Sequence, residues 1–148
     1  MSSELDMVAL GKRLAQCPMF RWLDGMLAIP PNLIKVDGIR IYWQHPGPMG
    51  VHNGGNRWPV SMHGPYVPHL GDPATVGCLL SLVRDAYAVP ELHTAHVGGY
   101  WHVENPHDES WDPDRGSGPW DTEAAALVAA LEAAEVQALD EKTRQQHR

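Results

Sequence analysis

Hydrophobic residues recur at helical spacing in three stretches of the chain. Near the N-terminus, Ser2 or Ser3 can cap a helix that runs to about Gln16, and Pro18 ends it because proline cannot continue the hydrogen-bond ladder. A second helix begins after Asp72, which is a good N-cap residue and is followed by a proline suited to the first helical position. Its predicted apolar face consists of Val76, Leu79, Leu80, Val83 and Tyr87.

The third helix is rich in alanine and is predicted to begin after a cap at Asp121. A narrow apolar stripe follows that cap, made of Ala124, Leu127, Val128, Leu131, Ala134 and Ala138. The polar tail from about Glu141 is expected to fray. From the two later helices we expect a buried core that contains Leu79, Leu80, Val83, Leu127, Val128 and Leu131.

Shorter apolar runs predict strands and two hairpins. Residues 25–29 form a strand pattern, and residues 33–36 and 39–43 flank Asp37-Gly38, a strong two-residue turn signal. Residues 92–97 and 100–104 flank Gly98-Gly99, a second such signal. Together with the helices, these runs predict an α+β fold, with an antiparallel sheet of about four or five strands and about three helices mainly on one face. The length suits a single domain over residues 1–148.

Three segments in the same order resemble a group of small uncharacterised proteins encoded by bacteriophages and prophages. They are Arg21-Trp22-Leu23-Asp24-Gly25-Met26-Leu27, the run from Asp72 to Tyr87, and the alanine-rich run from Thr122 to Ala134. The resemblance spans most of the chain. It implies a phage or prophage origin and an accessory role, such as blocking a host defence or sequestering a host molecule. It implies no chemistry, because no catalytic motif is attached to that group.

Charge and composition narrow the classes of partner. Eleven basic residues face eighteen acidic ones, for a net charge of −7, and no basic run is present, so we expect no direct nucleic-acid binding. No stretch approaches the length of a membrane span, and no signal peptide is apparent. Cys17 and Cys78 are too few for a disulfide scaffold. A protein of the bacterial host's cytoplasm fits these features, and its oligomeric state stays open.

The segment from Gln44 to Gly71 has no periodicity and is rich in Pro and Gly, so we expect a long loop. Its four histidines, His45, His52, His63 and His69, match no structural zinc spacing. Aromatic and methionine side chains alternate with them, as is typical of protein interfaces. We therefore predict a binding surface formed by Trp43, Arg57, Trp58, Met62, His63 and Tyr66, with Trp58 as its anchor or, alternatively, as a plug that holds the loop to the core.

The second hairpin offers the main candidate for chemistry. Its two-residue turn sets a register in which Val97 faces Tyr100 and His93 faces Glu104. His93, His102 and Glu104 then share the outer face, and two imidazoles with a carboxylate are ligands typical of a catalytic zinc or iron site. We favour a second interpretation over this metal site, namely a solvated hairpin face with a His–Glu cross-strand pair.

The loop from Asn105 to Trp120 holds an acidic run, Asp112-Pro113-Asp114-Arg115-Gly116, with Glu123 following. It resembles a calcium loop only in part, since its glycine is misplaced and no helix precedes it. We therefore interpret it as a turn-rich acidic loop. The chain contains no G-x-S-x-G, P-loop, H-E-x-x-H or Rossmann motif. Catalytic residues are therefore unassigned.

Two classes of function remain. The first is a small acidic phage accessory protein that binds a host protein or a small host molecule without catalysis and needs no cofactor. The alternative is a small metal-dependent enzyme that holds a divalent metal on His93, His102 and Glu104.

Overall fold

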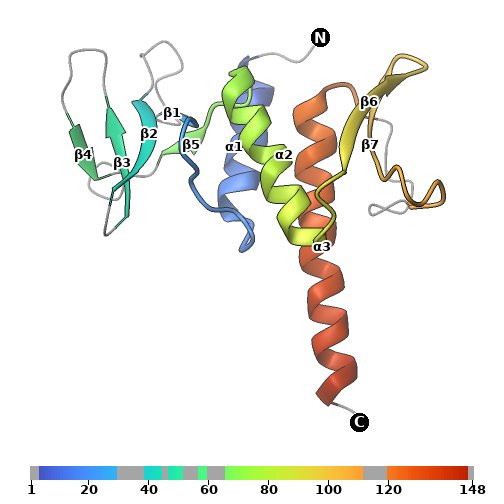
Figure 1. Ribbon diagram of the computed structural model, residues 1–148. Helices are drawn as coiled ribbons and strands as arrows, with labels where there is room; N and C mark the ends of the chain where they lie inside the picture. The colour runs from blue at the N-terminus through green and yellow to red at the C-terminus, as the bar shows by residue number, and fades with distance from the viewer. Residues whose placement is uncertain are drawn as a thin grey trace. The chain divides into compact units, whose positions relative to one another are not determined.

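The computed structural model describes residues 4–29, 39–44, 47–51, 57–59, 66–111 and 120–146. They form two compact units, unit 1 (Met1–Gln16 and Phe20–Cys78) and unit 2 (Cys17–Met19 and Leu79–Arg148). In chain order the elements are α1 (Glu4–Gln16), β1 (Leu27–Ile29), β2 (Ile39–Gln44), β3 (Gly47–Val51), β4 (Arg57–Pro59), β5 (Val67–Pro68), α2 (Pro73–Tyr87), β6 (His93–Val97), β7 (Tyr100–Glu104) and α3 (Glu123–Gln146) (Figure 1).

Unit 1 is built on a five-stranded antiparallel sheet with the order β4-β3-β2-β1-β5. Ala28 in β1 lies opposite Ile39 of β2 on one side and Pro68 of β5 on the other. The predicted strand at residues 25–29 is thus confirmed in its second half. The expected partner strand at residues 33–36 lies outside the described residues, whereas residues 39–43 do form β2.

The expected loop from Gln44 to Gly71 is wrong, because β3, β4 and β5 lie inside it. Glycine and proline hide these strands from a pattern search, since neither contributes to an alternation of polar and apolar side chains. β3 instead pairs with β2 residue for residue, from Arg40↔Val51 to Gln44↔Gly47. Pairing with an existing strand therefore decides the conformation. Pro59 lies in β4, at the edge of the sheet, where a missing N–H is tolerated.

Helix α1 packs against β5 at very close range. A Cβ placed on Gly11 would lie only 2.6 Å from the carbonyl oxygen of Pro68, so only glycine allows this approach of helix to strand. Val8 of α1 then forms a small buried cluster with Ile29 and Val67. This packing fixes the position of β5 and of the residue that precedes it, Tyr66.

Helix α2 has the predicted bounds, and its cap at Asp72 is confirmed, since Oδ2 of Asp72 accepts a hydrogen bond from the Thr75 N–H at 3.0 Å. The predicted apolar face is partly wrong. Leu79 and Val83 are buried as expected, but Leu80 is half-buried, and the remaining buried positions are Thr75 and Leu82. The buried face is rotated because it includes a threonine, whose hydroxyl has hydrogen-bond partners inside unit 1.

Unit 2 contains the second hairpin, whose register is confirmed: Val97 pairs with Tyr100, Ala95 with His102 and His93 with Glu104. Gly98 and Gly99 have φ angles of 63° and 87°, which is the reason that two glycines stand in the turn. The hairpin forms a two-stranded sheet of its own, and α3 packs against β7. Thr94 of β6 also donates a hydrogen bond to Oε1 of Glu123 at 2.8 Å.

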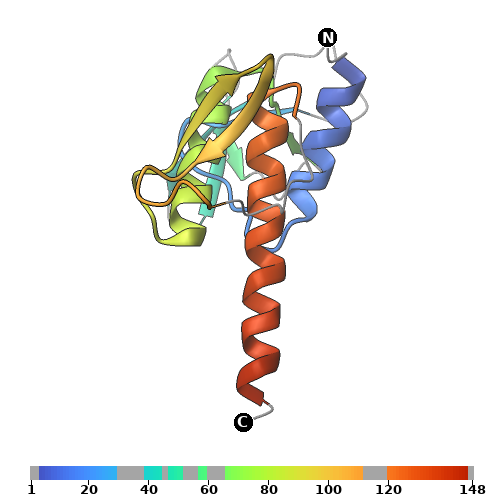
Figure 2. The same ribbon diagram turned by 90° about the vertical axis from the view of Figure 1, so that its right-hand side faces the viewer.

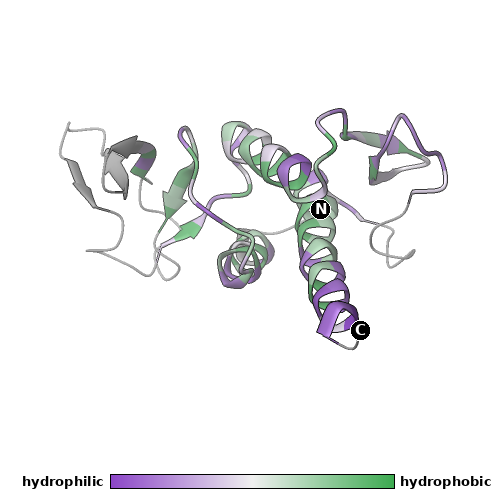
Figure 3. Ribbon diagram, turned by 60° about the horizontal axis from the view of Figure 1, so that its bottom comes forward, coloured by the Kyte–Doolittle hydropathy of each residue, from purple (hydrophilic) through white to green (hydrophobic). Residues whose placement is uncertain are grey.

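Helix α3 differs from the prediction at both ends. Thr122, rather than Asp121, caps it, since the Thr122 hydroxyl accepts the Ala125 N–H at 3.1 Å. At the other end the helix continues through the polar tail to Gln146. Leu127, Val128 and Leu131 are buried as predicted, but Ala138 is exposed. Within unit 2 the C-terminal half of α3 extends beyond the hairpin (Figure 2), and its surface becomes mainly hydrophilic (Figure 3).

The α+β fold with three helices and antiparallel sheets is confirmed for the described residues. Among the described residues the strands divide into two sheets, because the second hairpin pairs only with itself, apart from an isolated bridge between Trp101 and Trp120. Whether the two units together make the one domain expected from the sequence stays a prediction.

Candidate functional site

Unit 1 carries a groove lined by aromatic and basic side chains. It has a volume of about 620 Å³, within the range of ligand and side-chain binding pockets. The lining comes from the last turns of α1, from the segment that follows it, and from the start of β5. These lining residues are Lys12, Ala15, Gln16, Phe20, Arg21, Trp22, Tyr66 and Val67.

The local fold explains why these residues meet. Pro18 follows the end of α1 at Gln16, so the chain leaves the helix and returns along its C-terminal turns. Phe20 and Trp22 then contact each other edge to face, with ring centroids 5.2 Å apart. Tyr66 immediately precedes β5, which α1 holds through the close approach at Gly11. The aromatic walls of the groove are therefore fixed by helix packing and by an aromatic pair.

The groove has a positive lining in a protein of net charge −7. Lys12 and Arg21 contribute the two cationic groups, and the lining residues include no carboxylate. Such a surface attracts negative charge at its rim, while the aromatic walls favour apolar contact. The arrangement suits binding, because aromatic rings and cationic groups line the same groove.

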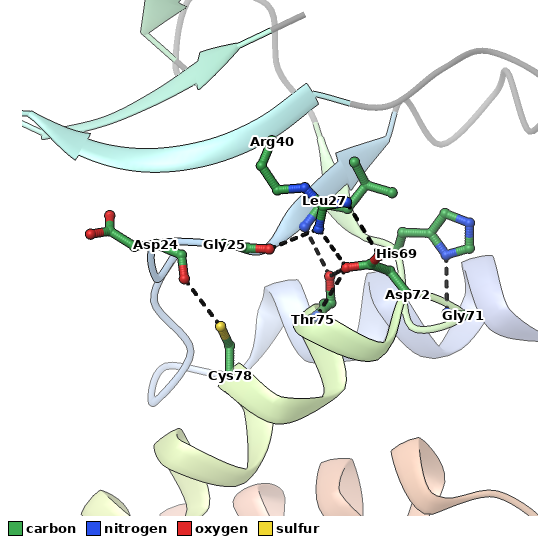
Figure 4. Close-up of polar contacts among 9 residues, drawn as sticks. All are labelled: Asp24, Gly25, Leu27, Arg40, His69, Gly71, Asp72, Thr75 and Cys78. Atoms are coloured by element: carbon green, nitrogen blue, oxygen red, sulfur yellow. Dashed lines mark hydrogen bonds and ion pairs between the residues drawn. The ribbon is translucent and has the colours of Figure 1, made fainter. Parts of the chain in front are cut away.

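A polar network links α2 to the sheet of unit 1 (Figure 4). Nη1 of Arg40 donates to Oδ2 of Asp72 at 2.7 Å and to the Gly25 carbonyl at 2.8 Å. The hydroxyl of Thr75, which is fully buried, donates to Oδ2 of Asp72 at 2.9 Å and accepts the Leu27 N–H at 2.8 Å. These groups satisfy one another inside the fold, so the network has a structural role.

The ionisation of Asp72 follows from this network. Burial tends to raise the pKa of its carboxyl group, but hydrogen bonds from Arg40 and from the side chain and backbone of Thr75 outweigh burial. The pKa of Asp72 is therefore lowered from its ordinary value, and the carboxylate is the form that the folded protein stabilises.

Neither cysteine has the surroundings of a nucleophile. Burial raises the pKa of Cys17, and the nearby Glu135 raises it further. Burial also raises the pKa of Cys78, whose thiol donates to the carbonyl oxygen of Asp24 at 3.3 Å (Figure 4). A raised pKa keeps both groups as thiols at neutral pH, whereas reactive cysteines need a stabilised thiolate.

Of the binding surface predicted from sequence, Tyr66 is the member whose side chain the structure describes, and it lines the groove. Trp43 belongs to β2, and Arg57 and Trp58 belong to β4, where the structure describes the course of the backbone. Met62 and His63 lie outside the described residues. The surface proposed on these residues, with Trp58 as its anchor, stays a prediction.

Sequence reasoning missed the other members of the groove. The sequence pattern places Lys12 in the first helix, and Arg21 and Trp22 belong to a segment that resembles phage proteins. Nothing in either pattern indicates that these residues lie near Tyr66. One signal was available. Aromatic residues at positions 20 and 22, on both sides of an arginine and directly after a helix ended by Pro18, resemble an interface segment more than a loop.

The candidate metal site on the second hairpin is only partly assembled. Nε2 of His93 lies 3.3 Å from Oε2 of Glu104, and both side chains are about half exposed. His102 shares their face in the register, yet in the part of the chain that the structure describes no three His, Cys, Asp or Glu side chains are grouped to hold a metal ion. The observed pair matches the alternative of a solvated cross-strand contact.

The other candidate ligand groups fall mostly outside the described residues. His45, His52 and His63 do so, and so does the acidic run at residues 112–116. The fourth loop histidine, His69, has a local role, since its Nδ1 accepts the Gly71 N–H at 3.0 Å and its carbonyl accepts the Asp72 N–H (Figure 4). His69 therefore shapes the turn that leads into α2.

Comparison with known proteins gives no assignment, because no family model, curated protein or solved structure matches the chain. Among the helices described, none combines the length and the apolar character needed to cross a membrane. The function must therefore be argued from the groove.

Proposed function

We propose that this protein is a non-catalytic binding protein that takes an acidic segment of a partner protein into the groove of unit 1. The observation that supports the proposal is the placement of Phe20, Trp22 and Tyr66 beside Lys12 and Arg21. Tryptophan, tyrosine and arginine are the residues that dominate binding energy at protein interfaces.

The chemistry of the lining defines the expected segment. The aromatic walls would take one large apolar side chain of the partner, and the volume of about 620 Å³ is sufficient for it. Acidic residues on either side of that side chain would meet Lys12 and Arg21 at the rim. Because both cationic side chains are exposed, they would mainly increase the association rate and the specificity, while the aromatic contact would supply most of the affinity.

The resemblance to phage and prophage proteins supplies the proposed setting. In that setting the partner is a protein of the bacterial host, and the role is that of a counter-defence inhibitor or a sequestering protein in the host cytoplasm. The absence of a grouped metal site among the described residues gives no support to the alternative of a metal-dependent enzyme.

The proposal is tested by affinity capture from a bacterial host lysate with the wild-type protein and with Trp22→Ala and Arg21→Glu, followed by titration of the captured protein with each purified variant. We expect loss of about 2 kcal/mol or more for Trp22→Ala, equal to at least about 30-fold in affinity. Arg21→Glu is expected to weaken binding mainly at low salt.

Matched controls separate the groove from the rest of the surface. Tyr100→Ala removes another exposed aromatic ring, at the tip of the second hairpin, and Arg144→Glu reverses a charge near the end of α3. Neither should change binding. Equal losses for Trp22→Ala and Tyr100→Ala, or a captured protein that binds all variants alike, would refute the groove as the binding site. The melting temperature of each variant is measured to check that a loss of binding does not come from unfolding.

A further inference from the structure

On its mainly hydrophilic surface, the C-terminal half of α3 carries a small apolar patch that unit 2 does not cover. Burial along the helix stops at Ala134, and every residue from Val136 to Gln146 is exposed. Val136 and Leu139 are each 57% exposed and lie three residues apart, on one side of the helix. Leu139 and Ala138 also line a groove of about 550 Å³ that runs beside Pro18 and Met19.

Two opposite charges on this surface form no ion pair with the described residues. Glu135 and Lys142 line the same groove and stand two helical turns apart, about 10.5 Å along the axis. No basic residue stands three or four positions from Glu135, and no acidic residue stands three or four positions from Lys142. Among the described residues neither side chain takes part in an ion pair; the recorded contact of Glu135 is with the Cys17 thiol.

We infer that this face of α3 binds the same face of a second copy of the chain, with the two helices antiparallel. If the twofold axis passes between Ala138 and Leu139, Glu135 lies opposite Lys142 of the partner subunit, and the pair is repeated on the other side of the axis. Leu139 then packs on Ala138 of the partner subunit, where a small side chain allows close approach. The same patch on the two copies is thus self-complementary, as an interface with twofold symmetry requires.

The charge pattern selects the orientation of the second copy. A parallel arrangement in register would place Glu135 against Glu135 of the partner subunit and Lys142 against Lys142 of the partner subunit, and both contacts are repulsive. The antiparallel arrangement replaces both with attraction. The exposed part of the helix, from Val136 to Gln146, is only about 16.5 Å long, so the buried area falls below that of a standard interface. Because this area is small, we expect a weak dimer whose population depends on the protein concentration.

The test uses charge reversal in the full-length chain, with association followed by sedimentation. The average molecular mass of the wild type should increase as the protein concentration is raised toward about 1 mM. High salt should make this increase smaller. Glu135→Lys and Lys142→Glu should each weaken association by about tenfold or more, because each places like charges opposite each other. An equimolar mixture of the two variants should associate again, since one copy then offers two lysines and the other two glutamates.

Two control variants and three contrary results complete the test. Arg13→Glu and Glu109→Lys change the net charge by the same amounts at positions outside α3 and should associate like the wild type. Leu139→Ser removes the apolar contact at an exposed position that cannot unfold the core, and it should weaken association. A wild type that stays monomeric at every concentration overturns the inference, as do single variants that associate normally. A mixture that fails to associate overturns the proposed register. The result is independent of the groove in unit 1.

Discussion

Arg40 and Asp72 form an ion pair that joins a strand to the beginning of a helix, with Nη1 and Oδ2 only 2.7 Å apart. The arginine belongs to β2, and the carboxylate caps α2. Asp72 therefore serves two elements that lie far apart in the sequence. Its side chain is 15% exposed, whereas that of Arg40 is 46% exposed, so the contribution of the charge itself is limited by solvent.

The first prediction separates the cap from the charge. Asp72→Asn keeps a good N-cap acceptor and removes the ion pair, so at neutral pH we expect a loss of about 1 kcal/mol or less in the free energy of unfolding. Asp72→Ala removes both and should cost about 0.5–2 kcal/mol more. Urea denaturation measures the three proteins. Equal losses for the two variants would show that the cap contributes nothing.

The second prediction concerns pH. Because the folded state lowers the pKa of Asp72, its contribution is complete above the unfolded pKa of about 3.9 and is lost as the pH falls through the lower, folded value. The difference in unfolding free energy between wild type and Asp72→Asn should therefore be constant above about pH 5 and shrink toward pH 3. A difference that grows on acidification would contradict the lowered pKa.

The buried threonine of α2 shows where the sequence could and could not predict this site. The helix, its cap and its bounds follow from local chemistry, because an aspartate and a proline at the start are sufficient signals. Which side of the helix is buried, in contrast, does not follow from local chemistry. Thr75 is polar and is not part of the predicted apolar face, but its hydroxyl accepts the Leu27 N–H, from a residue 48 positions earlier in the chain. Periodicity records side-chain polarity and contains no information about such a distant partner.

The third prediction tests that contact. Thr75→Val keeps the shape of the side chain but leaves the Leu27 N–H without its acceptor, so we expect a loss of about 1–3 kcal/mol. Thr75→Ser keeps the hydroxyl and loses one methyl group, which should cost about 1 kcal/mol. The order of stability, wild type above serine above valine, is measured by urea denaturation. A valine variant as stable as the serine variant would make the hydrogen bond irrelevant.

The fourth prediction concerns the rotated face of α2. Leu79→Ala should cost about 2–5 kcal/mol, because the side chain is completely buried. Leu80→Ala should cost clearly less, since Leu80 is half-buried. The sequence pattern alone predicted equal burial for both residues. Similar losses for the two variants would favour that original face over the observed one.

The groove of unit 1 could be predicted from the sequence only in fragments. The end of α1 at Cys17-Pro18 and the aromatic character of residues 20–22 are visible in the pattern. Their meeting with Tyr66 depends on β5, a two-residue strand that no hydrophobic period can reveal. The hairpin at Gly98-Gly99 is the opposite case, because its turn alone fixes the register, and the predicted pairs Val97–Tyr100 and His93–Glu104 are both confirmed.

The last prediction compares two helical glycines. In a free helix, replacing glycine by alanine stabilises by about 1 kcal/mol. Gly77 in α2 has nothing within 4 Å of the added Cβ, so Gly77→Ala should raise the melting temperature. At Gly11 the same methyl group would lie 2.6 Å from the Pro68 carbonyl oxygen and 3.6 Å from the Val67 Cβ. The nearest atom belongs to the backbone and cannot rotate away.

Gly11→Ala should therefore destabilise by about 1–3 kcal/mol in spite of its better helix propensity. It should also disturb the groove, since α1 must move away from β5 and Tyr66 directly precedes that strand. Thermal unfolding of both variants measures the first effect, and the amide NMR signals of residues 66–68 report the second. A stabilised Gly11→Ala variant with unchanged signals would mean that α1 does not approach β5 as closely as 2.6 Å implies. In that case the packing that fixes Tyr66 in the groove would have to be rejected.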